Sequence, residues 1–141
     1  MSKKHIDLCQ MMIILPAVVT AAEQGAAMEL REHIDKMCGV PLSVVKEDEE
    51  LGEAKAIYIG ATSYAASNQI TFPGNAFGEG WAIKAVGGNL VLCGGKTRGA
   101  LYAVYHLLED VLGVRWWNMW EEYVPEGNAI VPADYTSSGV P

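Results

Sequence analysis

Short apolar runs that end at glycine or proline recur along the chain, and runs of this kind are typical of buried strands. Gly87 and Gly88 separate two of these runs and predict a hairpin, because tight hairpin turns need a positive φ that glycine adopts without strain. The pattern therefore predicts a β-sheet. The predicted strands cover residues 10–15, 41–45, 56–59, 81–86, 89–93, 114–117 and 123–125.

An amphipathic helix is predicted between Thr20 and Gly39. Glu23 follows Thr20 at the spacing with which a hydroxyl and a carboxylate cap each other's free amides. Apolar residues then recur at three- and four-residue steps, so one stripe of the helix faces a core. The opposite side carries pairs four residues apart, Glu29 with His33 among them, and is expected to face solvent.

A second helix is predicted from Thr97, whose hydroxyl can cap it, to Leu112. A short helical turn is predicted over residues 64–68. The elements thus follow the order strand, helix, two strands, hairpin, helix and strand. This order indicates an α/β fold in which a mixed β-sheet is covered by two main helices.

The composition fits one domain of 141 residues, half of them hydrophobic, which is enough to form a core without metal or disulfide. The net charge of −7 and the lack of a basic run argue against nucleic-acid binding. No apolar stretch approaches the roughly 20 residues of a membrane span. We expect residues 1–9 to form an N-terminal lead, residues 10–131 a single α/β domain, and residues 132–141 a linker.

The apolar run over residues 11–15 is open to a second interpretation. Lys3 and Lys4 precede it, and residues 20–22 are small enough for a cleavage site, as in a signal peptide. The run is short, however, and Pro16 breaks it. A buried strand is therefore the favoured interpretation.

Residues that bind metals or cofactors do not occur at the spacings that such sites need. The three cysteines, Cys9, Cys38 and Cys93, form no CxxC pair and are interpreted as buried free thiols. The histidines show no HExxH spacing, and the acidic run over residues 47–50 is typical of a solvated loop. We predict no metal site, no cofactor and no catalytic residue.

The glycine-rich segment over residues 93–99 has some features of a phosphate-binding loop. The spacing excludes a P-loop, because Leu90 stands where that motif needs glycine. An anion site at the helix start stays physically allowed. We favour a tight strand-to-helix connection in which Thr97, Arg98 and Gly99 form the structural start of the helix, with Arg98 partly solvated and Gly99 packed against the sheet.

Three tryptophans, Trp116, Trp117 and Trp120, fall within five residues. Large aromatic side chains dominate interface energetics and also stack on sugar rings. Packing in the core or at a domain interface is favoured, and a carbohydrate platform is the alternative. Because successive residues of a strand face opposite sides, one of Trp116 and Trp117 is expected in the sheet core and the other outside it.

Three segments of the chain resemble a known module. They are the opening strand ending at Leu15-Pro16 with its capped helix and the exit Gly39-Val40-Pro41-Leu42; Ile57-Tyr58-Ile59-Gly60; and, most specific, residues 90–95 leading into 97–105 and 112–117. The module is the N-terminal, non-catalytic domain that precedes the TIM barrel in several glycoside hydrolases. These are the family 67 α-glucuronidases, the family 20 β-N-acetylhexosaminidases and related uncharacterised bacterial proteins.

The resemblance covers roughly residues 10–130 and implies an α/β fold similar to hexosaminidase domain 2. In that family the catalytic groups lie on the barrel, which typically has ~250 residues and does not fit in this chain. The resemblance therefore implies a non-catalytic accessory domain of a carbohydrate-active enzyme, of α-glucuronidase or β-N-acetylhexosaminidase type. Its partner would be a catalytic TIM barrel beyond the linker, and its location periplasmic, cell-surface or secreted. The alternative is a free-standing carbohydrate-binding domain that uses Trp116, Trp117 and Trp120 as a stacking platform.

Overall fold

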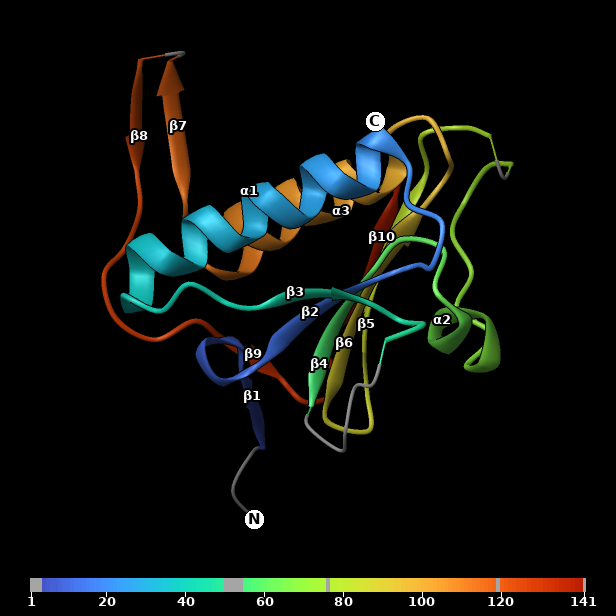
Figure 1. The fold of residues 1–141 in the computed structure, drawn as a ribbon. Helices are drawn as coiled ribbons and strands as arrows, with labels where there is room; N and C mark the ends of the chain where they lie inside the picture. Colours follow the sequence, from blue (N-terminus) through green and yellow to red (C-terminus); the bar gives the residue numbers. More distant parts are fainter. Residues whose placement is uncertain (1–3, 50–54, 76, 119, 141) are drawn as a thin grey trace.

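A mixed sheet forms the centre of the molecule. The structure is a computed structural model that describes residues 4–49, 55–75, 77–118 and 120–140. Its six-stranded sheet has the strand order β10-β5-β6-β4-β2-β3 (Figure 1). The parallel strands are β2 (Met12–Leu15), β3 (Val44–Lys46), β4 (Ala56–Ile59) and β6 (Asn89–Gly94). The antiparallel strands are β5 (Trp81–Val86) and β10 (Thr136–Gly139). The predicted α/β class with a mixed sheet is confirmed.

Helix α1 (Ala21–Cys38) follows β2 and covers one face of the sheet (Figure 1). Its start is the predicted capping box, in which the Glu23 amide donates to the Thr20 hydroxyl and the Thr20 amide donates to the Glu23 carboxylate. Its end is Gly39, with a φ of 74°. Both predicted boundaries of this helix are confirmed.

Helix α3 (Gly99–His106) lies beside α1 on the same face and continues into the π-helical turn η2 (Leu107–Val111). The prediction that Thr97 caps this helix is wrong. The Thr97 hydroxyl instead donates a hydrogen bond of 2.6 Å to the backbone carbonyl of Phe77, in the loop before β5. In the described residues, no helix combines the length and apolar character needed to cross a membrane.

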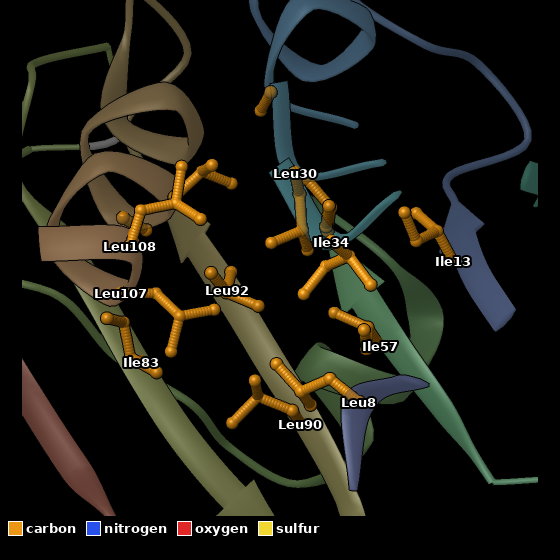
Figure 2. Packing of buried hydrophobic residues seen from close by; sticks show 14 of the residues in the cluster. Leu8, Ile13, Leu30, Ile34, Ile57, Ile83, Leu90, Leu92, Leu107 and Leu108 are labelled. Atoms are coloured by element: carbon orange, nitrogen blue, oxygen red, sulfur yellow. The ribbon is translucent and has the colours of Figure 1, made fainter. Parts of the chain in front are cut away.

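The main core lies between the sheet and the layer of α1 and α3. Its largest side chains come from α1, from η2, from the strands facing them and from Leu8 ahead of β2, and Figure 2 shows most of them. Burial of this apolar surface is the dominant favourable contribution to the free energy of folding. The residues labelled there are Leu8, Ile13, Leu30, Ile34, Ile57, Ile83, Leu90, Leu92, Leu107 and Leu108.

The other face of the sheet is covered in part by α2 (Ser63–Ser67), close to the predicted helical turn. Ala65 of α2 packs with Val91 and Cys93 of β6 in a smaller cluster. Within the acidic run predicted as a solvated loop, Glu47 accepts a hydrogen bond of 2.7 Å from the Ser63 amide at the start of α2. Glu50 of that run lies outside the described residues.

Both segments predicted to lie outside the domain take part in its pairing. In the predicted lead, β1 (His5–Asp7) pairs with β9 (Ile130–Pro132), and η1 (Leu8–Gln10) follows it. In the predicted linker, β10 forms the edge of the main sheet. The linker prediction over residues 132–141 is wrong, because the backbone of residues 136–139 pairs with β5. The composition of Thr136-Ser137-Ser138-Gly139 gives no sign of this pairing.

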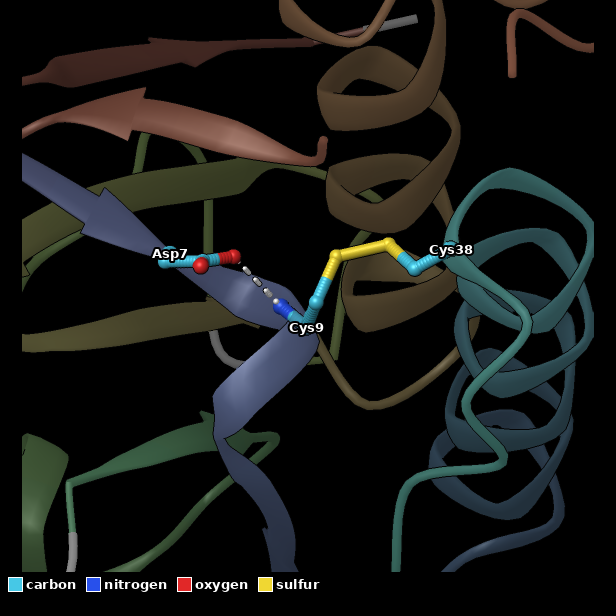
Figure 3. Close-up of a disulfide and its surroundings, with 3 residues drawn as sticks. All are labelled: Asp7, Cys9 and Cys38. Atoms are coloured by element: carbon cyan, nitrogen blue, oxygen red, sulfur yellow. Dashed lines mark hydrogen bonds between the residues drawn. A yellow bond between two sulfur atoms is a disulfide. The ribbon is translucent and has the colours of Figure 1, made fainter. Parts of the chain in front are cut away.

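Cys9 of η1 and Cys38, the last residue of α1, form a disulfide, which Figure 3 shows. The prediction of three free thiols is therefore wrong for these two, and Cys93 is free and buried. The Asp7 carboxylate accepts a hydrogen bond from the Cys9 amide at 3.0 Å and so shapes the turn that carries Cys9. The pairing was not readable from sequence because residues 29 apart meet only after α1 has packed on the sheet.

Candidate functional site

A two-stranded hairpin projects from the body of the molecule beside α1 (Figure 1). It consists of β7 (Arg115–Asn118) and β8 (Glu121–Tyr123), and we call residues 115–118 and 120–123 the arm. The Asn118 side-chain oxygen accepts hydrogen bonds from the amides of Trp120 and Glu121, at 2.7 and 3.0 Å, and so closes the turn. The strand predicted over residues 114–117 overlaps β7, whereas the strand predicted over residues 123–125 shares only Tyr123 with β8. The two observed strands pair with each other and are not members of the main sheet.

The outer face of the arm is aromatic and exposed. Trp117 is 67% exposed and stacks on Tyr123, with ring centroids 6.3 Å apart and planes 17° from parallel. Trp120, in the turn, is 85% exposed. Side chains of this size seldom remain so exposed without a partner, because they bring most of the apolar area to an interface.

The inner face of the arm rests on the helices. Trp116 packs edge-on against His33 of α1 and Tyr105 of α3, with centroid distances of 5.8 and 5.6 Å. Trp116 and Trp117 thus face opposite sides, as predicted. The expectation that one of them enters the sheet core is wrong, because their strand lies outside the main sheet and Trp116 keeps 37% of its surface exposed.

A carboxylate fixes the arm to α1. Glu122 of β8 accepts hydrogen bonds from Lys36 Nζ at 2.7 Å and Trp116 Nε1 at 3.0 Å, and its Oε1 lies 3.2 Å from His33 Nε2. The hydrogen bond from Lys36 is the largest cause that lowers the pKa of Glu122, and His33 adds to it. The same contact raises the pKa of Lys36. The arm is therefore held by charge-assisted hydrogen bonds on its inner face.

The predicted helix start is a close backbone contact. A Cβ on Gly99 would lie 2.5 Å from the Gly80 carbonyl oxygen, so only glycine fits there without movement. Arg98 is the first residue before α3 and is partly solvated as predicted, with its guanidinium paired to Glu79 at 2.6 Å. The Gly95 amide donates to the Gly80 carbonyl, and that hydrogen bond takes an amide which an anion would use. The segment is thus a tight strand-to-helix connection.

The described residues contain no group of three or more His, Cys, Asp or Glu side chains placed to hold a metal ion. Cys93 lines a pocket of about 240 Å³ at the ends of β4 and β6, together with Thr62 and Lys96. Burial raises the pKa of the Cys93 thiol to about 11, so it stays protonated at neutral pH. This thiol is therefore a poor nucleophile.

The sequence analysis assigned no role at this site to Tyr123 and Glu122 of the arm or to His33 of α1. A signal for Tyr123 exists, since two short β-prone runs flank Asn118 at hairpin distance. For His33 the prediction of a solvated position is wrong, because it is only 3% exposed under the arm. Nothing in the helical pattern of α1 indicates that a hairpin from far along the chain covers this position.

The comparison with protein families gives a match over residues 1–107 to the model described as "Glycosyl hydrolase family 67 N-terminus". The chain belongs to this family. The recognition made from the sequence is thereby confirmed. A comparison with curated proteins finds no match.

Solved structures contain folds similar to this family 67 N-terminal domain, and 37 chains match it. One is described as a novel family GH115 4-O-methyl-α-glucuronidase, BtGH115A, with specificity for decorated arabinogalactans. The TM-score is 0.63 at 14% identity, over 95% of this chain and 18% of that chain. At this identity the likeness shows the fold alone, and the present chain spans less than a fifth of that protein.

Proposed function

We propose that this chain is a non-catalytic accessory domain of a larger carbohydrate-active enzyme, and that the outer face of the arm docks against the catalytic barrel of that enzyme. Membership of the family 67 N-terminal domains supports the first part. The observation that carries the second is the exposed aromatic surface of Trp117, Trp120 and Tyr123. It is a concentrated apolar surface on an element that the domain's own core does not use.

The two faces of the arm have different roles in the proposed docking: the inner face fixes the arm, and the outer face binds the partner. Glu122 on the inner face holds the arm against α1, so the outer face is presented in one orientation. Preorganisation of this kind reduces the entropy lost on association. Tryptophan and tyrosine are also the residues that most often dominate binding free energy at the centre of an interface.

The test uses this chain and the catalytic region of its own parent protein, produced as separate polypeptides. We expect the two polypeptides to associate. We expect Trp117→Ala and Trp120→Ala each to raise the dissociation constant roughly tenfold or more, which is the scale of interface hot spots. Phe77→Ala is the matched control, because Phe77 is 70% exposed but lies outside the arm. Arm variants that bind as tightly as the wild type would contradict the docking surface.

A carbohydrate-binding role of the same tryptophans predicts a different response. Under that alternative, chitooligosaccharides or xylooligosaccharides shift the tryptophan fluorescence of the chain saturably at sub-millimolar concentration. The shift would disappear in Trp117→Ala or Trp120→Ala. Under our proposal the oligosaccharides cause no shift, and access of a fluorescence quencher to the tryptophans falls when the catalytic region is bound.

A further inference from the structure

His33 is a buried histidine whose two ring nitrogens both face hydrogen-bond acceptors. It is 3% exposed and lies between α1 and the arm. Its Nδ1 is 2.8 Å from the backbone carbonyl oxygen of Glu29, and its Nε2 is 3.2 Å from Oε1 of Glu122. A neutral imidazole carries one N–H and would leave a lone pair against one of these oxygens.

The His33 ring makes two contacts, one at each nitrogen, and each contact needs a proton to be a hydrogen bond. The carbonyl of Glu29 never donates, so the Nε2 contact requires a proton either on the ring or on the Glu122 carboxyl. Lys36 and Trp116 also donate to that carboxylate, at 2.7 and 3.0 Å, which favours its ionised form. The lowered pKa of Glu122 agrees with this. The second proton therefore belongs on the imidazole.

We propose that His33 is held as an imidazolium and acts as a proton-operated latch that fixes the arm to α1. The groups around it suit a buried cation. A carboxylate oxygen of Glu29 lies 3.4 Å from Nδ1, and the Tyr105 hydroxyl on α3 lies 3.5 Å from the other oxygen of that carboxylate. On the β8 side is Glu122, shared with Lys36. Lys36 is also paired with Glu32 at 3.6 Å, farther out on α1.

The sign of the pH dependence follows from the proton count. The latched arm binds one proton more than an arm whose His33 is neutral, so the latch is closed on the acidic side and loosens as pH rises. In the range where the released form is neutral and the latched form is still protonated, each pH unit shifts the equilibrium roughly tenfold toward release. At strongly acidic pH, protonation of Glu122 also opens the latch, below the ordinary carboxyl range because its pKa is lowered. A pH response of docking to a barrel would rest on the proposed function. The latch itself does not depend on that function.

The first experiment observes the proton directly in the full chain. With nitrogen-15 histidine, the ring signals of His33 are assigned by their loss in His33→Gln, while His5→Gln assigns the signals of exposed His5. We expect both ring nitrogens of His33 to carry protons at neutral pH. A single neutral tautomer, in a protein whose arm amides remain protected from hydrogen exchange, would overturn the latch.

The second experiment removes the need for the extra proton. In Glu122→Gln an amide nitrogen in the place of Oε1 can donate to the Nε2 of a neutral imidazole, in exchange for the hydrogen bond that Trp116 Nε1 donates to Oε1 in the wild type. We expect exchange protection of the β7–β8 amides, corrected for intrinsic rates, to fall with rising pH in the wild type and to lose that dependence in the variant. The same pH dependence in both proteins would overturn the proposal. Both measurements use the chain alone, so they succeed or fail independently of docking.

Discussion

At Gly99 the first turn of α3 meets two other pieces of backbone. A Cβ there would lie 2.5 Å from the Gly80 carbonyl oxygen and 2.6 Å from the Gly94 Cα, and neither neighbour is a flexible side chain that can turn away. Neighbouring Arg98 makes its ion pair with Glu79 at the surface, where screening by water leaves little net free energy. Two adjacent residues of the same connection therefore differ sharply in what they contribute.

Gly99→Val is expected to lower the free energy of unfolding by about 3 kcal/mol, because the backbone must shift to admit the side chain. Arg98→Ala is expected to change it little. Gly25→Val is the matched control for a β-branched residue in a helix, since nothing lies within 4 Å of a Cβ on Gly25. Denaturant midpoints measure all three, and a larger loss in Arg98→Ala than in Gly99→Val would contradict this helix start.

Cys93 is expected to make the fold sensitive to alkaline pH. Burial raises its pKa from 9.0 to about 11, so the folded state keeps the proton that the unfolded chain loses first. The free energy of unfolding is unaffected by titration of this thiol below about pH 9. On the order of 2 kcal/mol of that free energy is lost as pH rises toward about 11. Free energies of unfolding across this range should fall more steeply for the wild type than for Cys93→Ala. Equal slopes would count against the buried thiol.

At the scale of elements, the two ends of α1 are fixed in different ways. Its start is closed by Glu23, which is 6% exposed and also accepts a hydrogen bond of 2.7 Å from the Ala61 amide after β4. One carboxylate thus caps the helix and joins it to a neighbouring strand. The other end is tied to η1 by the Cys9–Cys38 disulfide. The helix is therefore tied to neighbouring segments at both ends, in addition to the packing of its apolar stripe.

Removal of the disulfide is expected to destabilise the domain. A cross-link between residues 29 apart restricts the unfolded chain by about 3–4 kcal/mol in the loop-entropy treatment. The double variant Cys9→Ser, Cys38→Ser should melt at a lower temperature than the wild type. A reductant should lower the melting temperature of the wild type and of Cys93→Ala, but not that of the double variant. Three reactive thiols in the denatured, unreduced protein would show that the pair does not form.

At the scale of the whole molecule, the core and the arm differ in what they do with their apolar side chains. The sheet with α1 and α3 buries the large apolar side chains, whereas the arm carries Trp117 and Trp120 outside this core. The contact between core and arm passes largely through polar and aromatic groups, His33 and Glu122 among them. The arm is thus a distinct surface on a domain that is packed without it.

The chain alone is expected to have no glycosidase activity. Glycoside hydrolysis needs two carboxyl groups facing one substrate across a few ångströms. The Glu122 carboxylate of the arm is instead paired with Lys36, and the Glu79 carboxylate, outside the arm, is paired with Arg98. Assays on aryl β-N-acetylglucosaminides and on xylooligosaccharides bearing glucuronic acid should give no turnover. Turnover that survives repurification and scales with protein concentration would contradict the accessory role.

Elements with local signals could be predicted from the sequence. The capping pair Thr20 and Glu23, the glycine at the end of α1 and the Gly87-Gly88 turn each act over a few residues, so their chemistry can be read without knowing the fold. The apolar run at Ala56–Ile59 likewise matches β4 at both ends. The mixed sheet followed from the order of these elements, and the family from the segments that resemble its module.

Features that depend on distant partners were decided by the tertiary structure. The segment Thr136–Gly139 is a strand only because β5 offers it an unpaired edge, and Cys9 meets Cys38 only because α1 packs across the sheet. His33 looks solvated on a helical wheel and is buried because the arm lies over it. The sequence by itself determined the elements that carry local signals and the three candidate tryptophans, Trp116, Trp117 and Trp120. Tertiary packing decided which face each ring occupies, since burial and proton sharing depend on contacts between residues far apart in the chain.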